Sequence, residues 1–80
     1  MTQSSYYEDE DVRDQLREAL IRVLIDKIRR DKYPSVTMMN MVENSLDDQA
    51  LRRYAGVLLD KIQNDQYPSI DMLKRLQALL

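Results

Sequence analysis

The chain of 80 residues contains no cysteine and no histidine. Disulfide bonds are therefore excluded, and sites for zinc, haem or iron–sulfur clusters lose their usual ligands. A domain this small buries only about 60–65% of the surface that its unfolded chain exposes, so it often needs a disulfide, a metal or a second subunit. Because oligomerisation is the aid that the composition leaves open, we expect a homo-oligomer with no cofactor and no metal.

Glycine and proline are scarce, with one and two residues respectively, and this scarcity favours an all-α protein. Long apolar runs are missing too, since a membrane-spanning helix needs about 20 apolar residues in succession. The first residues lack the basic start and apolar stretch of a signal peptide. We therefore expect a cytoplasmic protein with no membrane partner.

Charge is distributed unevenly along the chain. The net charge is -2, but residues 1–11 carry four acids and no base, which leaves 12 bases against 10 acids in the remainder. We expect residues 1–8 to form an acidic flexible leader and residues 9–80 to form one helical domain.

The chain contains an internal repeat with an offset of 34 residues. Residues 23–46 read VLIDKIRRDKYPSVTMMNMVENSL, residues 57–80 read VLLDKIQNDQYPSIDMLKRLQALL, and the two segments are identical at almost half of their positions. Such self-similarity indicates a repeated structural unit. Each copy contains Tyr-Pro-Ser at the same place, where proline ends one helix, serine caps the next and we expect tyrosine to pack over the corner.

These helix-ending prolines and helix-capping serines predict a four-helix bundle built from two tandem helical hairpins, residues 9–46 and 47–80. A capping box is expected to start the third helix at Ser45. The predicted helices cover residues 9–30, 36–45, 47–64 and 70–79.

The first long helix has an unusually wide apolar surface. Between Leu16 and Ile28 its apolar residues cover an arc of about 200°, against the usual stripe near 100°. The third helix repeats this pattern, and two short helices offer too little surface to cover both arcs. We therefore expect the long helices to form a homodimer interface.

The chain lacks the groups that most catalytic sites need. It has no cysteine or histidine to act as nucleophile or base, no glycine-rich phosphate loop and no serine with an evident base. The repeated pairs Asp26-Lys27 and Asp60-Lys61 fit solvated ion-pair faces, since Arg22 and Arg30 flank Asp26 at four-residue spacing. We expect neither an enzyme nor a small-molecule substrate.

The repeat also separates residues that a hairpin requires from those it does not. Arg29, Arg30 and Lys32 correspond to Gln63, Asn64 and Gln66, so the corner folds without positive charge. Helix-dipole stabilisation is one explanation of this cluster. The other is an anionic contact, made to a protein partner, to a phosphate backbone or to the chain's own acidic leader.

Met41 is the second difference between the copies, because its counterpart is the charged Arg75. Met38 and Met39 read as core, whereas Met41 lies about 100° from the centre of their face and suits an adaptable contact. We therefore predict a non-enzymatic protein–protein interaction module, an adaptor or regulatory protein, that binds its partner through Arg29, Arg30, Lys32 and Met41. The alternative is a small regulator that contacts nucleic acid through the basic corner.

Overall fold

The computed structural model describes residues 6–65 and 69–80, and all regular structure within these ranges is helical. The all-α class is confirmed. Each helix bound lies within three residues of the predicted one, and the largest difference is that residues 6–8, expected in the leader, begin the first helix. Residues 1–5 of that leader lie outside the described residues. The four helices are α1 (Tyr6–Arg30), α2 (Val36–Glu43), α3 (Asp48–Asn64) and α4 (Ile70–Leu79).

The two short helices begin at the predicted serine caps. Ser35 Oγ accepts a hydrogen bond from the backbone N–H of Met38 at 3.2 Å, and Ser69 Oγ accepts one from Met72 at 3.3 Å. Each bond satisfies a backbone donor that the first helical turn leaves without a partner. Local sequence therefore sets where α2 and α4 start.

The cap of α3 differs from the prediction. Asp47, and not Ser45, caps this helix, because the Asp47 carboxylate accepts a 2.7 Å hydrogen bond from the backbone N–H of Ala50. Ser45 belongs to the turn that closes α2, where its backbone N–H donates to the carbonyl of Val42. The turn after α2 takes up Asn44 and Ser45, so the cap of α3 falls later in the chain, at Asp47.

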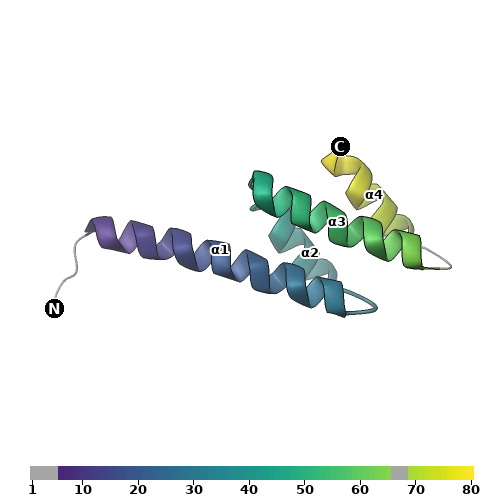
Figure 1. Cartoon of the computed structure of the whole chain (residues 1–80), viewed down its shortest axis with the longest axis horizontal. Helices are drawn as coiled ribbons and strands as arrows, with labels where there is room; N and C mark the ends of the chain where they lie inside the picture. Colours follow the sequence, from purple (N-terminus) through teal and green to yellow (C-terminus); the bar gives the residue numbers. More distant parts are fainter. Residues whose placement is uncertain (1–5, 66–68) are drawn as a thin grey trace.

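The helices pack as a small bundle in which α1 contacts both α2 and α3, and α3 also contacts α4 (Figure 1). Lys61 of α3 adds a polar link to the first hairpin, since its ammonium donates to the backbone carbonyl of Asp31 just beyond α1. All four helices contribute to one apolar core. The buried residues are Ile21, Leu24, Ile25, Ile28, Met39, Val42, Tyr54, Val57, Leu58 and Met72.

The first half of α1 projects from this bundle. Every residue from Asp11 to Leu20 is exposed except the half-buried Ala19, and Ile21 is the first buried residue of the helix. Figure 1 shows α1 running well beyond the ends of the other three helices, and the molecule measures 55 × 23 × 16 Å. The described part of the chain therefore leaves these first turns uncovered.

Equivalent residues of the two long helices are buried differently. Val23 is 50% exposed, whereas Val57, its counterpart 34 residues later, is 8% exposed. The next pair shows the reverse, because Ile25 is buried and Leu59 is 46% exposed. The two helices thus turn different sides of a similar apolar pattern towards the core.

Two adjacent leucines of α3 test this orientation. Leu58 is fully buried, so we expect Leu58→Ala to lower the free energy of unfolding by about 2–4 kcal/mol through lost contacts and a residual cavity. Leu59→Ala should cost less than about 1 kcal/mol, because much of that side chain is already in water. Urea unfolding followed by circular dichroism, at one fixed protein concentration, measures both changes. Equal losses would contradict the described rotation of α3.

Candidate interaction surfaces

An exposed apolar stripe follows the projecting half of α1. Its members are Val12, Leu16, Leu20 and Val23, which are 48%, 64%, 48% and 50% exposed. At roughly 100° per residue, their spacing places them on one side of the helix, with the half-buried Ala19 between them. We call these four residues the α1 stripe.

The α1 stripe lies nearly opposite the part of α1 that builds the core. By the same helical geometry, its midline is roughly 135° around the helix from that of the buried side chains between Ile21 and Ile28. The wide apolar arc predicted from the sequence is therefore divided, with one side in the core and the other in solvent. Sequence reasoning found the arc but named none of these four residues as a site, because its width does not reveal which side the other helices cover.

The predicted basic cluster lies at the end of α1 and in the corner that follows. Arg29, Arg30 and Lys32 are all exposed. The Asp26 carboxylate accepts a hydrogen bond from Arg29 and pairs with Arg30 at 2.7 Å. The bond from Arg29, together with the nearby positive charges, holds the pKa of Asp26 below its usual value. Asp26 thus offsets part of the positive charge, and it pairs with Arg29 and Arg30 where the spacing had suggested Arg22 and Arg30.

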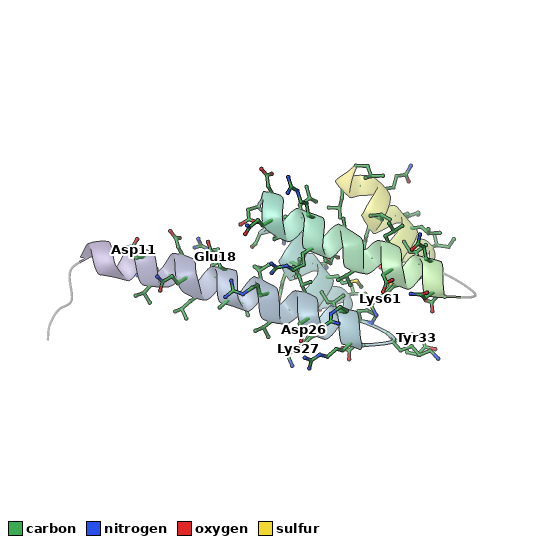
Figure 2. The ribbon with its side chains drawn as sticks, viewed as in Figure 1. Asp11, Glu18, Asp26, Lys27, Tyr33 and Lys61 are labelled. Carbon is green, nitrogen blue, oxygen red and sulfur yellow. The ribbon has the colours of Figure 1, made fainter. Side chains whose placement is uncertain are left out.

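Tyr33 does not occupy the position expected for it. The prediction that the tyrosine packs over the corner is wrong, since the side chain is 84% exposed and extends away from the body (Figure 2). The Lys32 ammonium lies 5.7 Å from the centre of its ring, at cation–π distance. The corner after α1 therefore forms without packing of the Tyr33 ring against the body. Tyr67, its counterpart, lies outside the described residues.

Met41 is exposed, as expected, with 44% of its surface in contact with solvent. Met39 is buried and Met38 half-buried against the core, also as expected. Met41 lies more than a turn into α2, whereas the basic cluster lies before that helix begins. The four predicted partner-binding residues are therefore all accessible, with Met41 on α2 and the basic three at the end of α1 and in the corner after it.

A partly buried polar network joins α2, α3 and α4. The hydroxyl of Tyr54 donates to the Glu43 carboxylate, and the Arg75 guanidinium donates to both oxygens of Glu43 at 2.9 and 3.0 Å. Arg75 also donates to Asp71 at 2.7 Å and to Asn40 at 2.9 Å. Only 11% of the Arg75 side chain is exposed, so its role is to hold helices together.

Arg75 corrects one step of the sequence reasoning. Its charge had been used as a sign that the equivalent position of Met41 faces solvent. Met41 is exposed, but Arg75 itself is not, because Glu43 and Asp71 compensate its charge. A charged residue indicates solvent only where no partner is available, and such partners cannot be found from one helix alone.

Tyr54 supplies a test of this network through pH. Burial, together with the neighbouring Glu43, raises the pKa of Tyr54 above its ordinary value of 10.0. The protonated hydroxyl of Tyr54 therefore makes its full contribution to the free energy of unfolding below pH 10. This contribution is lost as the pH rises, because the unfolded chain releases the proton at a lower pH than the folded chain does. We expect Tyr54→Phe to lower the free energy of unfolding by about 1 kcal/mol at neutral pH. The loss should shrink above pH 10.

Urea unfolding of the two proteins between neutral and alkaline pH measures this difference, and the other tyrosines cancel because both chains contain them. A difference that stays constant across pH 10 would contradict the raised pKa.

Within residues 6–65 and 69–80, no three acidic side chains gather where they could hold a metal ion. A shallow hollow between α1 and the start of α3 is lined by Arg17, Ile21, Asp47 and Arg53 among others. Its Asp47 carboxylate already caps α3. None of the described helices is long and apolar enough to cross a membrane.

No protein-family model, curated protein or solved structure matches this chain.

Proposed function

We propose that the protein is a non-enzymatic protein–protein interaction module that forms a homodimer through the α1 stripe. In this proposal the basic cluster and Met41 contact an acidic surface on a protein partner, as an adaptor or regulatory protein would. One observation carries the proposal: α1 exposes four large apolar side chains on a face opposite the one that it has already buried. A contiguous apolar stripe of this kind is typical of an interaction site.

The energetic gain from covering the stripe is considerable. Full burial of a valine or leucine is worth about 1.5–3 kcal/mol, so covering a half-exposed one contributes roughly 1 kcal/mol. Two paired stripes contain eight such side chains, which is comparable with the estimated cost of association, about 4–15 kcal/mol. Flanking contacts then decide how tight the dimer is.

The projecting helix itself supports the same proposal. Isolated helices of fewer than about 12–15 residues are marginal in water, and helices in proteins are stabilised mainly by packing of an apolar face. Residues 11–18 of α1 receive no such packing from the described body. A second molecule on the stripe would supply it.

Two leucines with nearly equal exposure test the dimer. Leu20 in the α1 stripe is 48% exposed and Leu59 on α3 is 46% exposed. We expect Leu20→Asp to convert a dimer into a monomer at micromolar concentration, because it places a charge in the apolar interface. Leu59→Asp introduces the same charge outside the stripe and should remain dimeric. Sedimentation velocity measures both, and circular dichroism checks that each variant keeps its helix content.

A parent chain that is monomeric at these concentrations would contradict the proposed dimer. If both variants dissociated alike, the interface would not be specific to the α1 stripe.

Binding of nucleic acid through Arg29, Arg30 and Lys32 is the competing function. The net charge of -2 and the pairing of both arginines with Asp26 argue against it. We expect the chain to elute from a heparin column at about 0.1 M salt or below, because Asp26 offsets part of the charge of Arg29 and Arg30 and the net charge of the chain is -2. Retention well above that concentration, lost when all three residues are changed to glutamine, would favour the nucleic-acid function instead.

A further inference from the structure

Resting on the proposed homodimer, we infer that the two α1 helices pair in antiparallel orientation. Each copy then brings its acidic first turns beside the basic last turns of the other. The occupant of the α1 stripe is a second copy of this chain. The acidic surface that meets Arg29 and Arg30 belongs to that copy, which is therefore the protein partner of these two arginines. Three features of α1 support this arrangement.

The first feature is the spacing along one edge of the stripe, where Ala19 lies closer than Leu20 to the line through Val12, Leu16 and Val23. Val12, Leu16, Ala19 and Val23 follow one another at intervals of four, three and four residues, which reads the same in both directions. A two-fold axis near Arg17 therefore sets Val12 of one copy opposite Val23 of the other. The same axis sets Leu16, the most exposed member of the stripe, opposite the small Ala19. Intervals of three and four residues are those with which paired helices interlock.

The second feature is charge. Residues 8–14 contain five acids and one base, whereas residues 17–30 contain five bases and two acids. Antiparallel pairing places the acidic part of one helix along the basic part of the other. Parallel pairing places acid beside acid and base beside base, which opposes association. Arg29 and Arg30 keep 60% and 72% of their side chains exposed while paired with Asp26, so they remain accessible to a second anion.

The third feature is the position of the folded body. Helices α2 and α3 pack on the second half of α1, nearly opposite the stripe (Figure 1). In an antiparallel pair the two bodies therefore lie at opposite ends of the paired helices and on their outer sides. The whole stripe can then be covered without contact between the bodies, whereas parallel pairing would set the bodies side by side at one end.

Disulfide trapping distinguishes the two orientations, and the chain is suited to it because it has no cysteine of its own. Two single variants are made, Val12→Cys and Val23→Cys. Each is oxidised alone with glutathione disulfide, and both are oxidised together after mixing under reducing conditions. We expect a covalent dimer on a non-reducing gel only from the mixture. In an antiparallel pair two copies of position 12 lie about 16 Å apart, far beyond the reach of a disulfide.

Leu59→Cys, on α3 outside the stripe, is the matched control for disulfides formed by random collision. Sedimentation of the reduced variants shows whether the dimer is present before oxidation. Covalent dimers from each variant alone, above the level of the Leu59→Cys control, would show parallel pairing and overturn this inference while leaving the proposed dimer intact. A dimer that yields no disulfide in any mixture would place the interface elsewhere and overturn both proposals. A monomer in every sample would overturn the proposed dimer itself.

Discussion

The width of the apolar surface on α1, set against the short helices available to cover it, determines most of this structure. At 1.5 Å per residue, the 25 residues of α1 extend about 37 Å, whereas the 8 residues of α2 extend about 12 Å and the 17 of α3 about 25 Å. Both partners are held near the C-terminal end of α1, since the chain turns back there at the Pro34 corner. Helices α2 and α3 can therefore cover one side of the second half of α1. The other side of that half, and the first half of α1, stay in solvent.

The attachment of α4 combines apolar packing with a network of polar contacts. Met72 is the only side chain of this helix that is fully part of the described core. Leu76 and Leu79 pack against that core while partly buried. Arg75 adds a polar link, through Glu43 on α2 and through the hydroxyl of Tyr54, which shares that carboxylate. A mostly buried cation is tolerated because acidic partners satisfy it, and such an arrangement fixes geometry more strictly than apolar contact does. The network thus sets where α4 lies across α2 and α3.

Much of the fold could be predicted from the sequence because its signals are local. The starts of α2 and α4 follow from Pro34, Ser35 and Ser69, whose effects extend over only a few residues. The cap of α3 was placed two residues early, at Ser45, because the length of a turn depends on how the flanking helices pack.

The orientation of each helix could not be predicted in the same way. Val23 and Val57 are both valines in a similar local sequence, yet Val23 is half-exposed and Val57 is buried. That difference arises from which helices pack against each long helix, and the residues within one repeat do not specify it. The same reason explains why the burial of Arg75 could not be predicted from its charge and why the α1 stripe was not recognised as a site.

The segregation of charge along α1 has two physical explanations, and they apply to different residues. The helix macrodipole favours acids in the first turn and bases in the last, but its effect decays within about one turn at each end. It therefore accounts for Lys27, Arg29 and Arg30. Asp14 and Arg17, in the middle of the helix, are accounted for by the 3.1 Å ion pair that they form with each other.

Asp11 and Arg22 are left without either explanation, since both are exposed and neither lies in a terminal turn. Antiparallel pairing lays the acidic part of α1, to which Asp11 belongs, along the basic part of a second α1, to which Arg22 belongs. A core of this size leaves little stability to spare, and anything that binds only the folded chain adds to its stability by mass action. The separation of acidic and basic residues that stabilises α1 within one chain would then also favour antiparallel pairing with a second α1. Folding and dimerisation would therefore both stabilise this helix.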